Sequence, residues 1–336
     1  MPDDIYMSDP FSVENLTIAL NENPTPPGQI GASGLFEEES LSETYVSIER
    51  QQDDLALVGS SARGGPGETT GDERRDAFNI NIPHFQRDDL VSADSVQNVR
   101  EFGTQNTPES VQARIVKKAQ KHARDLDNTL EHQRSGAIAG IVTDKNGLEH
   151  ANLYQQFGYA TPDAVQFDKT DKTKLLGKVF DELTFSIEDD LDRAYNRFHA
   201  FTGNEFHTWL WNHDQVRETF LNTNSAGQLR QATPDVFQFG GFTFERYKMG
   251  KNARKANGGS SYIASNQARV VPFGVQDMFK TCFGPADYVE TVNTLALPLY
   301  LKQFPTPNGK GRHIEVQMNA ISLCTRPQAL RKLTLV

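Results

Sequence analysis

Two runs of alternating apolar residues near the amino terminus are separated by a long stretch rich in glycine. Apolar and polar residues alternate within residues 44–58 and again at Phe78, Ile80 and Ile82. Alternation with a period of two is typical of strands that bury one face. The stretch between the runs, residues 59–76, is much longer than an ordinary hairpin turn. The pattern predicts one long hairpin whose tip is either disordered or ordered by a partner.

The tip of this hairpin consists of residues that favour irregular backbone. Its glycines suggest a phosphate-binding loop, but no Lys-Ser or Lys-Thr pair follows the last glycine and no helix follows it. We therefore interpret the tip as a flexible segment rather than a nucleotide site. The tip residues that we expect to contact another subunit are Gly59, Arg63, Gly64, Gly65, Pro66, Gly67 and Gly71.

Residues 1–42 form a second segment that cannot build a core alone. Pro24, Pro26 and Pro27 exclude a regular helix or ladder and predict an extended arm. Ordering the arm and the tip, about sixty residues, costs on the order of 60–120 kcal/mol. Neither segment can bury enough apolar surface on its own subunit to offset that cost, so other copies are the expected partners and can close rings that tile a shell. The arm residues expected to make such contacts are Phe11, Leu16, Ile18, Leu35 and Phe36.

A long amphipathic helix is predicted from residue 107 onward. Thr107 offers a hydroxyl N-cap, Pro108 suits the first helical position, and Gly136 is expected to end the helix. Apolar residues recur at steps of three or four from Val111 to Leu130, which indicates one buried face. The remaining surface is basic, either as ordinary solvated surface or as a contact for nucleic acid. Its basic residues are Arg114, Lys117, Lys118, Lys121 and Arg124.

The rest of the chain mixes helical and strand patterns without an internal repeat, which indicates the α+β class. An Asn-Gly pair at residues 146–147 predicts a tight turn, and Gly203 is expected to separate two helices. Strands are predicted at residues 138–143 and 148–157, from residue 236 onward and at residues 313–325, and helices at residues 186–201 and 204–221.

Composition excludes several classes of function. Residues 1–100 hold 19 acidic residues against 6 Lys and Arg, and the whole chain has a net charge of −10. A protein whose main task is to bind nucleic acid is normally basic, so this composition speaks against that class of function. No window approaches the roughly eighteen apolar residues of a membrane helix, and the amino terminus lacks the pattern of a secretory signal. Cys282 and Cys324 are too few for a disulfide framework and lack zinc-site spacing, so buried thiols are expected.

A metal-dependent hydrolase is the alternative from another class. His199, His207 and His213 lie near Glu205 and Asp214, but the histidine spacings of eight and six residues do not give the i, i+4 pairs of a helical metal site. No nucleophile elbow, local Cys–His pair or dinucleotide fingerprint occurs in the sequence. Structural histidines are therefore favoured, and no catalytic residue, metal or cofactor is predicted.

Short stretches in a consistent order carry a resemblance to a known family. In the first half they are Leu35-Phe36-Glu37, residues 44–49, Arg63-Gly64-Gly65-Pro66-Gly67, Ile82-Pro83-His84-Phe85 and residues 96–103. In the second half they are residues 239–245, residues 285–294 and Leu323-Cys324-Thr325-Arg326-Pro327. Together they span nearly the whole chain, which resembles the lambda-like major capsid protein E family of tailed bacteriophages, with its Hong Kong 97-type capsid fold.

The resemblance implies a particular division of the chain. The expected parts are an N-terminal arm (residues 1–42), an extended E-loop hairpin (43–90), a peripheral domain (91–160) with a spine helix (107–135), a mainly axial domain (161–301) and carboxyl-terminal strands that return to the peripheral and axial core (302–336). The absence of lysine from residues 51–86 speaks against a covalent cross-link through this loop.

The resemblance also implies a function and partners. The chain is expected to assemble in the host cytoplasm, as hexamers and pentamers, into the icosahedral capsid of a virion that encloses packaged double-stranded DNA. The basic helix face would line the lumen and contact the DNA non-specifically. A decoration protein, a portal and a separate scaffold are implied partners, and no membrane is involved. An encapsulin-like nanocompartment shell, which encloses cargo enzymes, is the alternative with the same fold.

Overall fold

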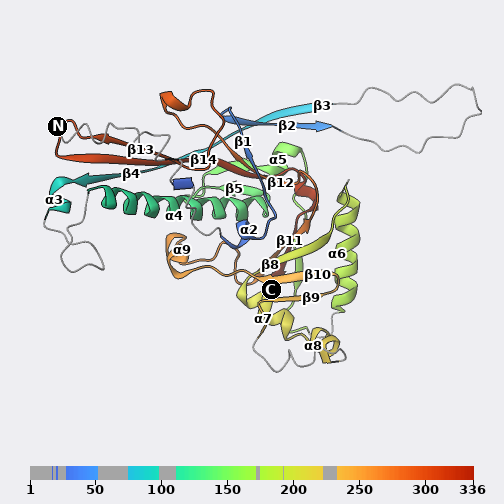
Figure 1. Ribbon diagram of the computed structural model, residues 1–336. Helices are drawn as coiled ribbons and strands as arrows, with labels where there is room; N and C mark the ends of the chain where they lie inside the picture. Colours follow the sequence, from blue (N-terminus) through green and yellow to red (C-terminus); the bar gives the residue numbers. More distant parts are fainter. Residues whose placement is uncertain are drawn as a thin grey trace, which may run out of the picture.

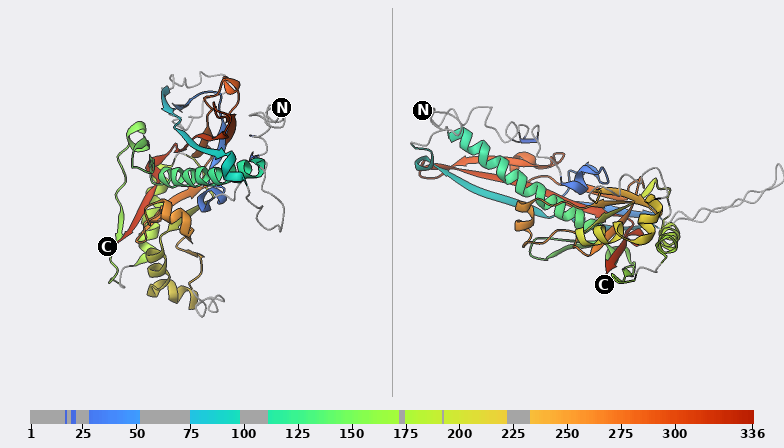
Figure 2. Two further views of the ribbon diagram at one scale, coloured as in Figure 1. Left: turned by 90° about the vertical axis from the view of Figure 1, so that its left-hand side faces the viewer. Right: turned by 90° about the horizontal axis from the view of Figure 1, so that it is seen from below.

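The computed structural model describes residues 17, 20–21, 28–51, 75–97, 111–171, 175–191, 193–221 and 233–336. These residues form two units that meet at an angle (Figure 1). The first, which we call the peripheral unit, follows the long helix α4 (Val111–Ala137), which spans about 40 Å. The second, the axial unit, is built around a six-stranded sheet near the carboxyl end of α4 (Figure 2). This mixed architecture confirms the α+β class.

The peripheral unit is a sheet with α4 packed on one face. Ile314, Val316 and Met318 alternate along the strand β14 and are buried in one cluster with the apolar stripe of α4, which includes Ile115 and Leu126. The first part of β14 pairs with β4 and β13, its second part pairs with β12, and β1 runs parallel to β12. The elements of this unit besides α4 are β1 (Glu37–Ser40), β4 (His84–Ser92), α3 (Ala93–Val96), β12 (Phe279–Phe283), η3 (Val289–Thr291), β13 (Tyr300–Pro305) and β14 (Gly311–Cys324).

The axial unit has an aromatic core between its sheet and α6. The strand order is β7-β15-β11-β8-β10-β9. Phe198 and Phe242 stack with ring centroids 5.2 Å apart, and Phe180 of α6 lies 5.3 Å from Phe242. The strands are β7 (Val165–Phe167), β8 (Arg197–Thr202), β9 (Val236–Phe239), β10 (Phe242–Arg246), β11 (Gln267–Phe273) and β15 (Arg331–Leu335). The helices are α6 (Leu176–Asp190), α7 (Asn204–Trp211), α8 (Asp214–Leu221), α9 (Lys251–Ala256) and η4 (Pro327–Ala329).

Both predicted hairpins are present. The long one consists of β2 (Tyr45–Gln51) and β3 (Arg75–Asn81), which pair antiparallel and project away from the body (Figure 1). Its base is anchored by Val46 and Ile80, which are buried, and by Phe78, whose ring meets that of Phe157 edge to face. The short hairpin consists of β5 (Ile141–Thr143) and β6 (Glu149–Asn152). It is shorter than predicted because the chain enters the helix α5 (Leu153–Phe157) at Leu153.

Two of the predicted helices are wrong in extent. Residues 186–201 do not form one helix, because α6 ends at Asp190 and residues 197–202 form the central strand β8. The residues of β8 after Arg197 are all buried, and a strand that is buried on both faces shows no alternating period that separates it from a helix. Residues 204–221 form two short helices rather than one. The helix α4 also passes through Gly136 and ends at Ala137.

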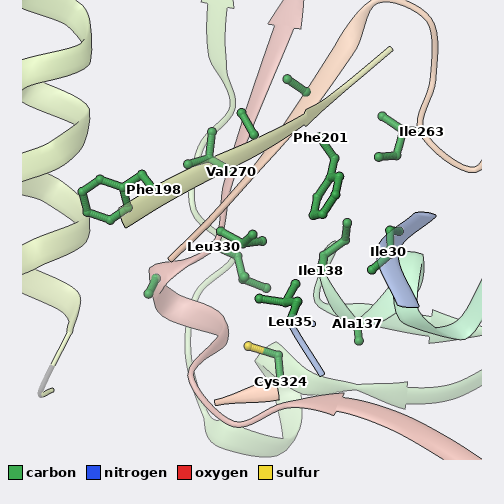
Figure 3. Packing of buried hydrophobic residues seen from close by; sticks show 14 of the residues in the cluster. Ile30, Leu35, Ala137, Ile138, Phe198, Phe201, Ile263, Val270, Cys324 and Leu330 are labelled. Atoms are coloured by element: carbon green, nitrogen blue, oxygen red, sulfur yellow. The ribbon is translucent and has the colours of Figure 1, made fainter. Parts of the chain in front are cut away.

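The segment just before β2 belongs to the core of its own subunit. The short helix α2 (Gln29–Ala32) places Ile30, which is fully buried, beside Ala137 and Ile138 (Figure 3). Leu35 is only 8% exposed, and the ring of Phe36 packs against Phe279 of β12. Leu35 and Phe36 were predicted to contact another subunit; the structure places Leu35 in the core of its own subunit and leaves Phe36 partly buried, and contacts of either residue with another subunit stay a prediction.

The two units do not follow the predicted boundaries strictly. Residues 84–90, assigned to the E-loop, pair with β14 and so belong to the peripheral sheet. The strands β12 and β13 also lie in that sheet, although they fall within the segment predicted as mainly axial. The carboxyl-terminal strands serve both units, since β14 is peripheral and β15 is axial. Among the described residues, no helix combines the length and the apolar character needed to span a membrane.

Candidate assembly surfaces

One side of α4 presents basic side chains to solvent. Lys117, Lys121 and Arg124 are exposed and follow one another at steps of four and three residues, which places them on one helix face. Arg114, one turn before Lys117, is half-buried. The Nε atom of Arg124 donates to the backbone oxygen of Gln120 at 3.2 Å, a contact within the helix. We call Lys117, Lys121 and Arg124 the basic stripe.

Lys118 differs from the other basic residues of α4. Its Nζ atom lies 2.7 Å from Oδ1 of Asp89 and 2.9 Å from the backbone oxygen of Leu90, both in β4. Burial alone would raise the pKa of Asp89, but hydrogen bonds from Lys118 and from the Leu90 N–H outweigh it and hold this pKa below its ordinary value. Lys118 therefore ties α4 to the peripheral sheet.

A buried carboxylate joins the N-terminal segment to both units. Glu131 of α4 accepts hydrogen bonds from the N–H of Ile30 at 2.8 Å, the N–H of Gly31 at 3.1 Å and the hydroxyl of Tyr247 at 3.1 Å. Burial and the negative charge of Glu131 raise the pKa of Tyr247, so the phenol stays protonated and donates. A Cβ atom on Gly28 would lie 2.2 Å from Cδ of Glu131, so only glycine leaves room for this carboxylate.

Further polar contacts hold the same segment in place. Arg134, buried one turn after Glu131, donates to Oε1 of Glu38 at 2.6 Å and to the hydroxyl of Thr281 at 3.3 Å. On the other side, the backbone N–H of Lys248 donates to the side-chain oxygen of Gln29 at 2.6 Å. The segment at residues 28–40 is thus attached to α4, the peripheral sheet and the axial unit together.

The remaining predicted contact residues lie outside the described residues. These are the tip residues Gly59, Arg63, Gly64, Gly65, Pro66, Gly67 and Gly71 and the arm residues Phe11, Leu16 and Ile18. The described base of the hairpin, β2 and β3, projects away from the body of the subunit (Figure 1). Contacts of the tip and arm residues with other subunits stay a prediction.

The three histidines of the hydrolase alternative have separate surroundings. Nε2 of His199 lies 3.0 Å from Glu245, whose pKa is lowered mainly by the hydrogen bond from this ring. The ring nitrogens of His207 contact the hydroxyl of Thr202 at 2.8 Å and the carbonyl oxygen of Pro234 at 2.7 Å. His213 is buried against the ring of Trp209. Within the described part of the chain, no three His, Cys, Asp or Glu side chains are grouped to hold a metal.

One exposed apolar surface was missed by the sequence analysis. The connection between β12 and β13 exposes Val289, Val292 and Leu295, and Val289 is 89% exposed. It lies on the face of the peripheral sheet opposite α4 (Figure 1). The only signal in the sequence is the closeness of these residues among polar neighbours, because the spacing does not reveal which side chains remain uncovered.

Comparison with known sequences gives a consistent result. Residues 12–335 match the model of the family described as phage major capsid protein E. The major capsid protein of Salmonella phage Felix O1 is 23% identical over 350 aligned residues, which cover 95% of each chain. The major capsid protein of Pseudomonas phage KPP10 is 25% identical over 352 residues, with 96% of each chain covered.

Solved structures share the fold at low sequence identity. The capsid protein of cyanophage P-SCSP1u gives a TM-score of 0.54 at 10% identity, covering 94% of this chain and 90% of that one. The capsid of an empty GTA particle gives a TM-score of 0.51 at 11% identity, and the match covers 100% of this chain and 97% of that one. These likenesses confirm the Hong Kong 97-type capsid fold. Because the family model covers the chain almost from end to end, the chain belongs to the phage major capsid protein E family and is a structural subunit of a phage head.

Proposed function

We propose that this subunit closes, as hexamers and pentamers, into an icosahedral head around packaged double-stranded DNA, with the basic stripe of α4 facing the DNA. The observation that supports the DNA contact is the exposed positive charge of this stripe. Within the described residues, neither Lys117 nor Lys121 forms an ion pair, so their charges are available to phosphate. A positive face on a chain of net charge −10 fits a partner with a high density of negative charge.

The projecting hairpin supports the assembly part of the proposal. A two-stranded hairpin is at best marginally stable by itself in water, so a second surface must stabilise its outer part. A neighbouring subunit supplies that surface in a shell, and head-to-tail contacts of this kind close into rings. A decoration protein, a portal and a separate scaffold remain proposed partners, and assembly in the host cytoplasm remains the proposed route. The proposed role is structural, without a catalytic step.

Electron microscopy of the purified protein tests this proposal, with sedimentation to measure particle size. Closed polyhedral shells, or regular tubes and sheets of capsomers, are the expected result. A monomer at every protein concentration, salt concentration and scaffold addition would contradict it. Nuclease-protected DNA in heads purified from infected cells separates a genome container from a nanocompartment, which would contain protein cargo instead.

Neutral substitutions in the basic stripe test the DNA contact. Lys117→Gln, Lys121→Gln and Arg124→Gln together should leave the subunit and empty shells intact, while reducing DNA retention and making it less sensitive to salt. The measurement is DNA content per head as the salt concentration is varied. Lys118→Gln is the matched control, because it should lower the stability of the subunit through the lost contact with Asp89 and leave DNA retention unchanged. Unchanged DNA retention in the triple variant would remove the proposed contact.

A further inference from the structure

The outer face of α6 exposes a phenylalanine surrounded by carboxylates. Phe185 is 62% exposed. Four acidic residues lie three or four positions from it, which places them on the same helix face: Asp181, Glu182, Glu188 and Asp189, all of them exposed. The opposite face of α6 packs into the axial core through Phe180 and Leu183. We call these five exposed residues the α6 face.

Three of these carboxylates have no cationic partner among the described residues. Glu182 lies 3.7 Å from Lys178, and Glu188 accepts a hydrogen bond from the hydroxyl of Tyr195. Asp181 and Asp189 form no ion pair in the described part of the chain. An aromatic ring among unpaired carboxylates is poorly suited to an apolar partner, because that partner would desolvate the charges without compensating them. It is well suited to Lys and Arg side chains, which can meet both the ring and the acids.

The opposite flank of the axial unit has the complementary charge. Residues 246–276 contain six Lys and Arg and no acidic residue. Arg246 and Lys248 are both paired with Asp235. The remaining basic residues near α9 are exposed, and none of them forms an ion pair within the described residues: they are Lys251, Arg254 and Lys255. Figures 1 and 2 show α6 and α9 on opposite flanks of the axial unit, so these charges cannot meet within one subunit.

We propose that the α6 face of one subunit binds the basic α9 segment of the next subunit around each capsomer, an inference that rests on the proposed assembly into rings. The occupant is a second copy, because one chain carries both complementary surfaces on opposite flanks. Two α6 faces placed against each other would repel, and so would two α9 segments. This charge arrangement therefore disfavours a symmetric dimer and selects the head-to-tail contact that closes a ring.

Charge reversal on each flank tests the pairing. Asp181→Lys with Asp189→Lys reverses the unpaired acids of α6, and Lys251→Glu with Lys255→Glu reverses α9. Each pair alone should lower the yield of shells by about tenfold near physiological salt. All four substitutions in one chain restore complementary charges and should recover most of the yield. Shell yield is measured by sedimentation and electron microscopy, and thermal unfolding of the dissociated subunits verifies that each variant folds.

Phe185→Ala provides a second test that does not depend on reversed charges. It should reduce shell yield, whereas Leu148→Ala, at a similarly exposed position of 64% in the β5–β6 turn, should not. Wild-type yield from either charge-reversed pair would overturn the inference. Loss of yield in both pairs without recovery in the fourfold variant would also overturn it, because the two flanks would then have different partners. Failure of the unaltered protein to form shells would instead contradict the proposed function itself.

Discussion

At the scale of single residues, the buried carboxylate of Glu131 holds the N-terminal segment to both units. Its three donors come from α2 and from the residue after β10. Removing one partner of a buried charged hydrogen bond leaves the others unsatisfied, which costs about 1–3 kcal/mol for each buried group. The contact therefore stabilises the angle between α4 and the axial unit as well as the segment itself.

Glu131→Ala is expected to lower the free energy of unfolding of the isolated subunit by about 3 kcal/mol. Gly28→Ala should act through the same contact, since its Cβ would displace the carboxylate. Denaturant unfolding of both single variants and the double variant measures the coupling, and the double variant should lose clearly less than the sum of the two. Additive losses would mean that Gly28 acts through its backbone rather than through Glu131.

The raised pKa of Asp127 predicts that the free energy of unfolding of the subunit depends on pH. Burial raises its pKa to about 6, with opposing smaller effects from Arg134 and Glu38. In the unfolded chain its pKa is near the model-peptide value of about 3.9, so the folded subunit binds a proton between roughly pH 6 and pH 4 that the unfolded chain does not. Asp127 therefore weakens the fold above pH 6, and its penalty disappears as the pH falls through this window.

Asp127→Asn should raise the free energy of unfolding by about 1 kcal/mol at about pH 7.5 and leave it nearly unchanged at about pH 4. Denaturant unfolding of dissociated subunits at both values measures this difference. Asp125→Asn is the control, because it removes an exposed ion pair with Arg87 and should cost less than about 1 kcal/mol. A stabilisation of Asp127→Asn that is equal at both pH values would show that the charge of Asp127 is not its cause.

At the scale of secondary-structure elements, periodic patterns located α4 but misplaced the helix before β8. The apolar residues of α6, Leu176, Phe180, Leu183 and Ile187, do follow helical spacing, and this signal was available in the sequence. The prediction placed the helix too late because residues 198–201 belong to a strand that is buried on both faces and so show no alternating pattern. Burial on both faces is a property of the assembled sheet, and the local period does not contain it.

Gly203, at the junction of β8 and α7, is required by close packing. A Cβ atom there would lie 2.0 Å from the backbone oxygen of Ala264, and neither segment can move without disturbing the sheet. Gly203→Ala is expected to lower the free energy of unfolding by about 3 kcal/mol or more. Gly250, the N-cap of α9, is the matched control, because a Cβ there meets nothing within 4 Å. Gly250→Ala should cost less than about 1 kcal/mol in the same unfolding experiment.

At the scale of the whole molecule, folding of the subunit and assembly of the shell depend on different parts of the chain. The two larger buried clusters of the described residues are built from the peripheral and axial units and include the base of the long hairpin. We expect its tip, which lies outside the described residues, to take no part in either cluster. Substitutions at the tip should therefore affect contacts between subunits far more than the stability of one subunit.

Replacement of Gly64, Gly65 and Gly67 by valine tests this separation. Valine restricts the backbone where glycine allows many conformations, so the tip should no longer fit a neighbouring subunit. Assembly, measured by sedimentation and electron microscopy, is expected to fail, while thermal unfolding of the dissociated subunit should change little. Variants that failed to fold as monomers yet still assembled would show that the tip had been placed wrongly.

The sequence by itself determined the features that depend on neighbours along the chain. The period of α4, the alternation at Val46 and Ile80, and the turn at Gly147 are local, and each was predicted. The basic residues of α4 were also identified, but only the packed structure separates Lys118, which binds Asp89, from the exposed stripe. That difference depends on β4, which is remote in sequence.

Only the tertiary structure decided where the N-terminal segment belongs and which surfaces remain uncovered. From the sequence, Leu35 and Phe36 were assigned to an arm that contacts another subunit, because the segments against which they pack, β12 and α4, lie far along the chain. The opposite charges of α6 and α9 are visible in the sequence, but their location on opposite flanks is not. Contacts between remote segments arise from the packing of the whole chain, and no local pattern records them.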